Sequence, residues 1–356
     1  MRRRLALPLA ALLTTCAAAH AAEMPAKAEE PVRADTVFTP EVALVQGVVE
    51  GLTEYLPVSS TGHLILVNAW MDLEKETPLL GRDGAPVLVS QKAGLKERAM
   101  AKLRGEPAPE AKSPVAYTLK QATDDYSIVI QFGAILAVLF AYRARVTATV
   151  AGVLRGRRES LLLARNLIVA FIPAAVLGLA LGKLIDEYLF NPYTVAGALV
   201  AGGALMLWVE RRYRRVVEHA GMETGPDLHE LSVRQSLTIG FCQCAALWPG
   251  TSRSMMTIVG GYLAGLSPVR ATEFSFLLGL ITLTAASAYK GLKHGPQLVA
   301  AFAPSNMLLG MAVATVVAFA SVKWMVGWVS KRGIAVFAWY RFALAFVVLA
   351  WAILDA

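Results

Sequence analysis

The sequence predicts an all-α polytopic membrane protein, built as an inverted-topology repeat with six transmembrane helices and two re-entrant helical hairpins. Of its 356 residues, 56% are hydrophobic and only 17% are charged, whereas ordinary soluble domains are about one quarter charged. Apolar stretches recur at a length of about 20 residues, which a helix needs to cross the hydrocarbon of a bilayer. In addition, two short polar motifs interrupt the apolar sequence, one in each half of the chain.

The first 22 residues are typical of a secretory signal peptide. They begin with the basic residues Arg2 to Arg4, continue with an apolar run, and end near the small-residue pattern Ala19-His20-Ala21. These are the three parts of a cleavable signal. Residues 23–40 would then form a periplasmic N-terminal segment.

Six apolar segments have the length of transmembrane spans. They lie at about residues 126–142, 166–186, 193–210, 270–289, 306–326 and 338–354. Three spans follow each polar motif, so the chain divides into a first repeat, 41–210, and a second repeat, 234–356, with a polar loop at 211–233. Because three is an odd number, the second repeat must run inverted relative to the first.

Each repeat opens with two short apolar arms, at 41–71 and 235–266. The arms are joined by Pro57-Val58-Ser59-Ser60 in the first repeat and by Pro249-Gly250-Thr251-Ser252 in the second. Each arm is too short to span comfortably, and non-helical backbone at membrane depth must be buried in protein or face a water-filled cavity. We therefore predict re-entrant hairpins; the alternative is one kinked span in each repeat.

Basic residues mark the cytoplasmic side. Arginines gather at 143–165 and 211–234, and Lys331-Arg332 precede the last span. By the positive-inside rule these loops face the cytoplasm, so the polar insertion 72–124, which we expect to be partly flexible, and the 290–305 loop face the periplasm. The net charge of +8 is interpreted as topology signals and contacts with membrane lipids, rather than a nucleic-acid surface.

The first polar motif places Gln46, Glu50 and Glu54 four residues apart, which on a helix forms one stripe. Two carboxylates one turn apart repel in a low dielectric unless positive charge lies between them. A divalent cation with oxygen ligands supplies that charge. Glu50 and Glu54 are therefore candidate metal ligands, and Gln46 a candidate substrate contact; the alternative is a pair of interfacial carboxylates facing solvent.

Hydroxyl groups and a histidine follow at the start of the second arm. Ser59, Ser60 and Thr61 can cap helix amides, or can point with those amides at an anion such as phosphate. Capping alone is the simpler reading for any one of them. His63 lies within one turn of Ser60, which favours a catalytic role over that of an ordinary core histidine.

The second motif contains Thr251, Ser252, Arg253 and Ser254 at the matching helix start. The planar guanidinium of arginine suits phosphate oxygens, so Arg253 is a candidate phosphate-binding residue and its neighbours candidate substrate contacts. The alternative is an arginine that extends its charge to the membrane surface.

Four further residues lie within apolar sequence. We expect structural ion pairing for Glu273 and Arg341, with a supporting role at the site for Glu273. Cys242 and Cys244 are too close together for a usual zinc pair, and we expect both to be core residues.

The stretches EGLTEYLPVSSTGH and ALWPGTSRS resemble the defining motifs of the undecaprenyl-diphosphate phosphatase family, also called the bacitracin-resistance family. The resemblance extends from about residue 41 to the C-terminus and includes VIQFGAILAV, FIPAAVLG and EFSFLL. The signal-like N-terminus and the 72–124 insertion depart from the usual pattern. By motif match, the resemblance assigns functional roles to Glu50, Glu54, Ser60, His63 and Arg253, with Ser59, Thr61, Ser252 and Ser254 lining the same site.

The resemblance implies an inner-membrane enzyme that removes the terminal phosphate from undecaprenyl diphosphate on the periplasmic side. It also implies a dependence on Mg²⁺ or Ca²⁺, and a product that is recycled as the lipid carrier for peptidoglycan. We expect Ser60 or a water to attack phosphorus, with His63 as acid and base or as a phosphohistidine. A polyprenyl-phosphate flippase or an ion-coupled transporter is the rival reading, and a homodimer is left open.

Overall fold

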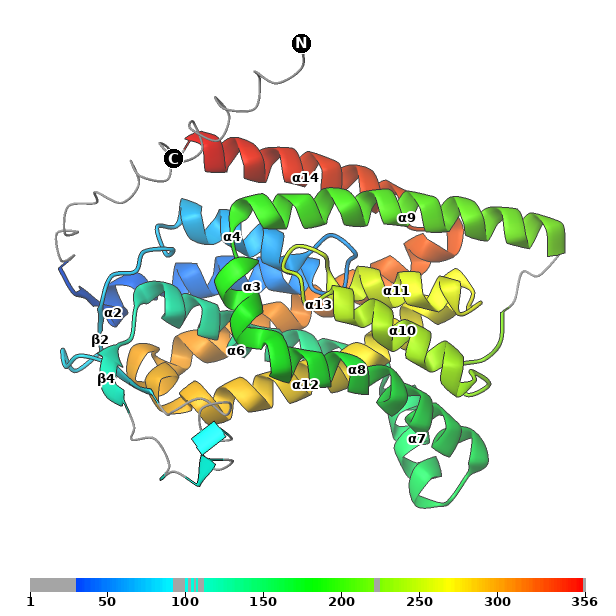
Figure 1. The fold of residues 1–356 in the computed structure, drawn as a ribbon, viewed down its shortest axis with the longest axis horizontal. Coiled ribbons are helices and arrows are strands. Elements are labelled where there is room, and N and C mark those ends of the chain that lie inside the picture. The colour runs from blue at the N-terminus through cyan, green and yellow to red at the C-terminus, as the bar shows by residue number, and fades with distance from the viewer. Residues whose placement is uncertain are drawn as a thin grey trace, which may run out of the picture.

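The structure is a computed structural model. It describes residues 30–91, 100–101, 104–105, 107, 112–220 and 225–354. The expected signal peptide, residues 1–22, lies outside them. In the described part, long helices run side by side along one axis, and shorter helices lie between them (Figure 1).

Six helices of the described chain are long and apolar enough to cross a membrane, which confirms the predicted number of spans. They are α6 (Leu119–Ala141), α8 (Arg158–Tyr188), α9 (Pro192–Ala220), α12 (Pro268–Ala301), α13 (Pro304–Arg332) and α14 (Ala335–Leu354). Helix α9 continues into the loop expected at 211–233, and α12 into the one expected at 290–305. Charged residues end an apolar stretch without ending a helix, so the sequence placed these helix ends too early.

Each repeat opens with a pair of short helices. They are α3 (Pro40–Thr53) with α4 (Ser60–Trp70), and α10 (Val233–Ala245) with α11 (Arg253–Leu263). The longest has 14 residues and therefore measures roughly 21 Å at 1.5 Å per residue, less than the ~30 Å of a hydrocarbon core. The two turns meet inside the bundle, where the Ser254 hydroxyl donates to the Leu56 carbonyl at 2.8 Å.

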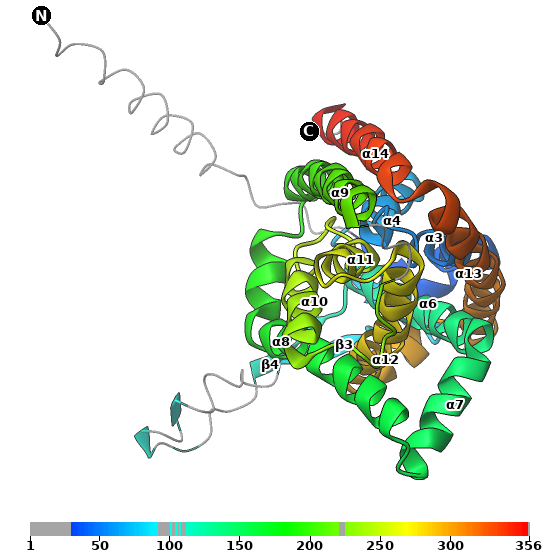
Figure 2. The same cartoon turned by 90° about the vertical axis from the view of Figure 1, so that its right-hand side faces the viewer.

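Several of the helix contacts are approximately two-fold symmetric: a contact made by a helix of one repeat is matched by a contact of the equivalent helix in the other repeat. Helix α3 packs against α13, and its counterpart α10 packs against α8, which is the matching span of the other repeat. Helix α6 packs against its counterpart α12, and α9 against its counterpart α14 (Figure 2). Each hairpin is therefore held by a span of the opposite repeat, as an inverted repeat requires.

Small residues allow these close contacts. A Cβ on Gly51 of α3 would lie 2.7 Å from the carbonyl oxygen of Ala314 in α13, and one on Gly240 of α10 would lie 2.6 Å from that of Ala170 in α8. Without side chains at these positions the helix backbones approach directly, a common device in membrane helix packing. The same device thus holds both hairpins.

Two features differ from the sequence expectation. The predicted 143–165 loop contains helix α7 (Arg143–Leu154), which stands away from the bundle and turns into α8 at Gly156 (Figure 2). Its first turn contains Arg143 and Arg145, which the sequence analysis assigned to a cytoplasmic loop, so the helix was not expected.

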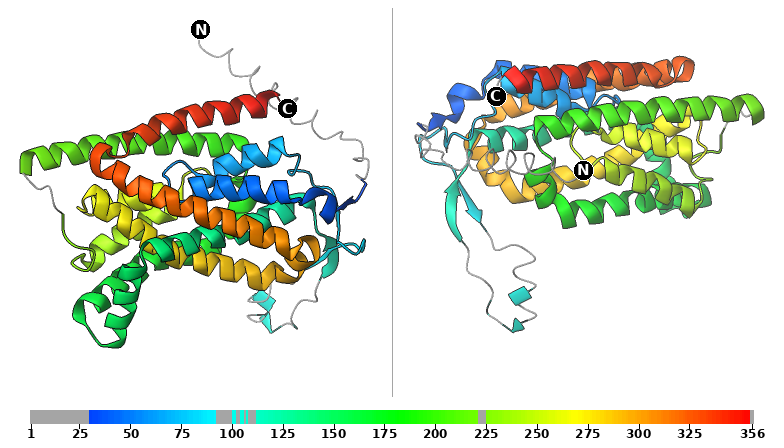
Figure 3. Two further views of the ribbon diagram at one scale, coloured as in Figure 1. Left: turned by 180° about the vertical axis from the view of Figure 1, so that it is seen from behind. Right: turned by 45° about the horizontal axis from the view of Figure 1, so that its top comes forward.

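The predicted insertion, 72–124, contributes three short strands of the described chain at one end of the bundle, and a fourth strand precedes the first hairpin (Figure 3). The strands pair as β1 (Val32–Arg33) with β2 (Leu79–Leu80), in parallel, and β3 (Leu88–Gln91) with β4 (Lys112–Ala116), antiparallel. A separate hydrophobic cluster, which includes Leu79, Tyr117 and Phe302, joins this end to α12. The short helix α2 (Ala34–Val37) follows β1 in the chain and contributes Ala34 to this cluster. Part of the insertion lies outside the described residues.

Candidate active site

The two hairpin turns share an unusual backbone conformation. Ser59 has φ 75° and ψ 101°, and Ser252 has φ 74° and ψ 116°. Residues other than glycine rarely take positive φ, and such strain, of order 1–3 kcal/mol, gathers at functional sites. Each serine caps the helix that follows, because its Oγ accepts from the amide of Gly62 or Met255 at 3.3 Å. Turns of the same strained conformation therefore begin α4 in the first hairpin and α11 (Arg253–Leu263) in the second.

Glu54 is the hub of the side-chain cluster between these turns. Its Oε1 accepts from Arg253 Nη2 at 2.8 Å, and its Oε2 accepts from the Ser60 hydroxyl at 2.8 Å. Arg253 also donates to the Ser275 carbonyl at 3.2 Å and lies over the Tyr55 ring, 5.2 Å from its centroid. A serine hydroxyl bonded to a carboxylate is the arrangement of a nucleophile with its base.

Glu50 lies one turn before Glu54 and is 1% exposed, and its Oε1 is buried without a hydrogen-bond partner within the described chain. Gln46 presents a second such oxygen, although its amide nitrogen donates to Asn68 at 2.7 Å and so joins α3 to α4. No group of three or more His, Cys, Asp or Glu that could hold a metal ion occurs among the described residues. The carboxylates nevertheless fit Mg²⁺ or Ca²⁺, which take oxygen ligands and are often held by only one or two carboxylates plus substrate phosphates and water.

His63 is held at both ring nitrogens. Nδ1 lies 2.7 Å from the Ser59 carbonyl, and Nε2 lies 2.7 Å from the Tyr340 hydroxyl, whose ring stacks on the imidazole. A carbonyl oxygen can only accept, so Nδ1 carries the hydrogen and Nε2 of the neutral ring is the basic atom. The Ser60 hydroxyl bonds to Glu54 rather than to His63.

Of the other predicted substrate contacts, some lie at the hairpin turns and some lie away from the cluster around Glu54. Ser252 and Ser254 are bonded to each other at 3.1 Å, and Ser254 also ties the second turn to the first through Leu56. Thr61 follows Ser60 and is half-buried. Gln46 lies farther down α3, and Thr251 faces a separate cavity, so the structure places these two outside the cluster around Glu54.

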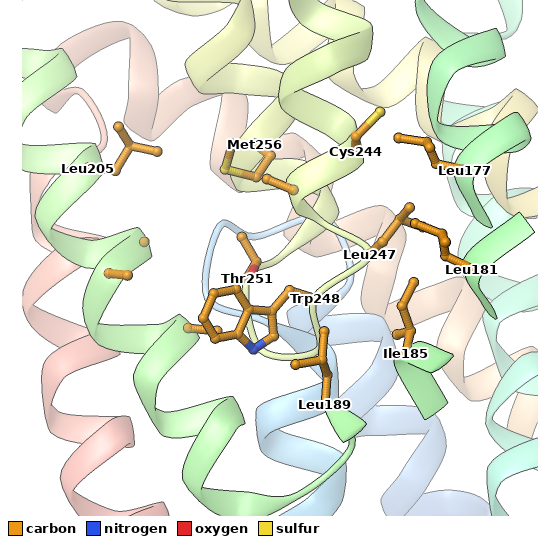
Figure 4. Close-up of a pocket in the computed structure, with 14 residues that line it drawn as sticks. Leu177, Leu181, Ile185, Leu189, Leu205, Cys244, Leu247, Trp248, Thr251 and Met256 are labelled. Carbon is orange, nitrogen blue, oxygen red and sulfur yellow. The ribbon is translucent and has the colours of Figure 1, made fainter. Parts of the chain in front are cut away.

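That cavity is apolar, has a volume of about 390 Å³, and lies between α8, α9 and the end of α10 (Figure 4). Trp248, Thr251 and Met256 of the second hairpin form one wall, opposite Leu181 and Ile185 of α8. The wall is continuous in sequence with Ser252 and Arg253. An apolar space therefore adjoins the polar turn.

The remaining ionisable residues depart in part from expectation. Glu273 forms ion pairs with Arg145 (3.4 Å) and Arg270 (3.9 Å), as expected, but in a group with Asp227 rather than with the hairpin turns. The expected ion pair of Arg341 is wrong: its guanidinium donates to backbone carbonyls instead.

Sequence reasoning missed Tyr55, Ser275 and Tyr340 as contacts of site residues. Tyr55 follows Glu54, and Ser275 belongs to the EFSFLL segment, so adjacency was a usable signal for both. Tyr340 is 277 residues from its partner His63, and no spacing in the sequence could connect them.

A buried carboxylate, hydroxyl and guanidinium, presented by paired hairpin turns in an inverted repeat, define a class of polytopic membrane protein with a site suited to phosphate groups. The chain belongs to one such family: the model described as "Bacitracin resistance protein BacA" matches residues 43–89 and 112–347, which confirms the predicted resemblance.

Relatives named undecaprenyl-diphosphatase include one from Ectopseudomonas mendocina, 41% identical over 308 residues, covering 86% of this chain and 92% of the relative. One from Sorangium cellulosum is 40% identical over 310 residues (86% and 84%). A third, "Undecaprenyl-diphosphatase 1" of Chromobacterium violaceum, is 40% identical over 312 residues (86% and 94%).

Proposed function

We propose that this protein is an integral membrane phosphatase that hydrolyses undecaprenyl diphosphate to undecaprenyl phosphate and inorganic phosphate. The observation that carries the proposal is the pair of bonds at Glu54, one from the Ser60 hydroxyl and one from Arg253. These contacts support assigning Ser60 as the nucleophile, Glu54 as its base and Arg253 as the phosphate-binding cation. Names of relatives with about 40% identity supply the substrate.

In the proposed reaction, Arg253 and the amides at the two helix N-termini hold the diphosphate. Glu54 takes the proton from Ser60, or from a water at the same place, as the oxygen bonds to the terminal phosphorus. The bond between that phosphorus and the bridging oxygen breaks, and undecaprenyl phosphate leaves. If Ser60 attacks, water then releases phosphate from the serine. His63 exchanges a proton through Nε2, which its Nδ1 bond leaves basic.

Glu50 and Glu54 would hold the divalent cation, Mg²⁺ or Ca²⁺. When bound, such an ion neutralises charge on the phosphate oxygens and on the leaving group. The buried, unpartnered Oε1 of Glu50 supports this assignment, because a lone buried carboxylate oxygen is costly until a cation or donor reaches it.

The apolar cavity beside Thr251 takes the first isoprene units, while the rest of the chain stays in lipid. We assign the protein to the bacterial inner membrane, and the arginine-rich loops support an orientation in which the site faces the periplasm. There it would return the lipid carrier to peptidoglycan synthesis and confer resistance to bacitracin.

The test is phosphate release from undecaprenyl diphosphate by purified protein in detergent, with Mg²⁺ or Ca²⁺ and with a chelator. We expect release that needs the metal and is lost in Glu54→Ala, while Glu159→Gln, an exposed carboxylate of α8, behaves as wild type. No release by folded wild-type protein would contradict the proposal and favour the transporter, for which lipid flipping in liposomes is the next measurement.

A further inference from the structure

Two adjacent residues of α14 contact different hairpins. The Tyr340 hydroxyl lies 2.7 Å from His63 Nε2 in the first hairpin, and Arg341 Nη2 donates to the Gly250 carbonyl, at 3.0 Å, in the second. Successive residues of a helix point about 100° apart, so one position on α14 can reach both. The reaction described above gives no role to Tyr340 or Arg341, although Tyr340 contacts the nitrogen through which His63 exchanges its proton.

Arg341 is an unusual side chain for a membrane span. It is 0% exposed, and its Nη2 and Nε donate to the Ala198 and Leu199 carbonyls of α9 at 3.0 and 3.2 Å. Within the described chain it has no carboxylate partner, and its Nη1 is buried without any partner. An ionised group at membrane depth is costly and is by default functional.

The neighbouring backbone is shaped around this guanidinium. A Cβ on Gly202 of α9 would overlap Arg341 Nη2, so only glycine leaves the space. Gly250 itself has φ 92° and precedes the strained Ser252 by two residues. Holding its carbonyl fixes the direction in which the Ser252–Arg253 turn faces, and hence the approach of Arg253 to Glu54.

We propose that Tyr340 and Arg341 are positioning residues for the proposed phosphatase reaction. Arg341 fixes the second hairpin turn against α9, and Tyr340 fixes the His63 ring, so that one helix sets the relative positions of the two turns. Lysine cannot replace Arg341, because bonds to three carbonyls on two segments require the planar fork of the guanidinium. A misplacement of about 1 Å at a reacting group costs on the order of 10²-fold in rate.

The test is a double-mutant cycle with Arg341→Lys and Arg253→Lys, measured as phosphate release. Arg341→Lys should lower kcat by on the order of 10²-fold and change KM much less. If it acts through the turn that carries Arg253, its effect should shrink when Arg253 is already lysine. Effects that simply multiply, or a wild-type kcat in Arg341→Lys, would overturn the proposal.

Two controls separate positioning from stability and from the reaction itself. Val348→Ala removes packing from a fully buried position of α14 that lies in a hydrophobic cluster with Val195 and Leu199 of α9 and Ile65 of α4, and that makes no side-chain hydrogen bond to a hairpin turn. It should therefore lower Tm and leave kcat unchanged. Tyr340→Phe leaves the buried charge in place; it should lower kcat with KM and Tm near wild type, and an unchanged kcat would remove Tyr340 from the proposal. Failure of wild-type protein to release phosphate would instead contradict the proposed function.

Discussion

Glu54 and Arg253 are 199 positions apart in the chain, yet their side chains meet at 2.8 Å between the two hairpin turns. Both are largely shielded from solvent, with side chains 6% and 11% exposed. Each repeat supplies one partner, so neither repeat contains the site by itself.

Replacing Arg253 by alanine should abolish phosphate release and also destabilise the protein. Removing one partner leaves the Glu54 carboxylate buried without its cation, which costs about 3–5 kcal/mol for a buried pair. The measurement is phosphate release together with thermal unfolding in detergent. Arg158→Ala, at an exposed arginine of α8, is the matched control and should change neither.

Ser60→Ala tests the nucleophile. If Ser60 attacks phosphorus or orients the attacking water, kcat should fall by at least about 10²-fold, the scale of lost acid–base or nucleophilic assistance. Rapid-mixing measurements would add a second readout, because a phosphoserine intermediate gives a burst of released undecaprenyl phosphate. A variant with a near-wild-type kcat would restrict Ser60 to capping, the simpler reading of its position.

Glu50→Gln should weaken the binding of divalent metal more than it weakens substrate binding. The amide keeps the size of the side chain but removes the charge that a hard cation prefers. We expect a higher Mg²⁺ concentration at half-maximal rate and a smaller rise of Tm on adding Mg²⁺ without substrate. An unchanged Mg²⁺ dependence in both measurements would exclude Glu50 as a ligand.

Ala245→Leu should narrow the apolar cavity from its exposed rim. Because the added side chain occupies space assigned to the first isoprene units, KM for undecaprenyl diphosphate should rise, and kcat should change little. Inorganic pyrophosphate, which has no chain, supplies the comparison: its turnover, however slow, should be equal in both proteins. Equal KM values for the lipid would place the chain elsewhere.

Asp227 gives a prediction about pH. Partial burial opposes its ionisation, but the Leu228 amide, Arg270 and Arg145 outweigh that effect and hold the pKa of Asp227 below its ordinary 3.8. A depressed pKa stabilises the folded state above the unfolded value, and this contribution is lost as pH falls through the folded pKa. The difference in Tm between wild type and Asp227→Asn should therefore be constant from pH 7 to about 5 and shrink below 3.8. A difference that already shrinks near pH 6 would contradict this.

Most of the fold could be predicted from the sequence, because the bilayer restricts what an apolar chain can form. Span number and the hairpins followed from segment length and from the turn residues around Ser59 and Ser252. Helix ends could not be placed, since α9 and α12 continue beyond their apolar parts. Helix α7 was hidden because its arginines also serve as topology signals.

The site was predictable only where its residues are close in sequence. The residues that spacing could relate all lie in the first hairpin, on α3, on α4 or at the turn between them: Glu50, Glu54, Ser60 and His63. Only the similarity of the two motifs suggested that Arg253 lies near Glu54. The bonds of Tyr340 and Arg341 depend on how α14 packs against α9 and both hairpins, and such packing leaves no local pattern.

The matching strained serines, Ser59 and Ser252, bear on how this chain evolved. Two turns with matching φ and similar ψ are the pattern expected from internal duplication of a short chain whose second copy runs antiparallel to the first. Duplication and fusion would then have freed each copy to specialise. One copy carries the carboxylates and the histidine, and the other carries the arginine, so a cluster of unlike side chains is built on two nearly equivalent backbone turns.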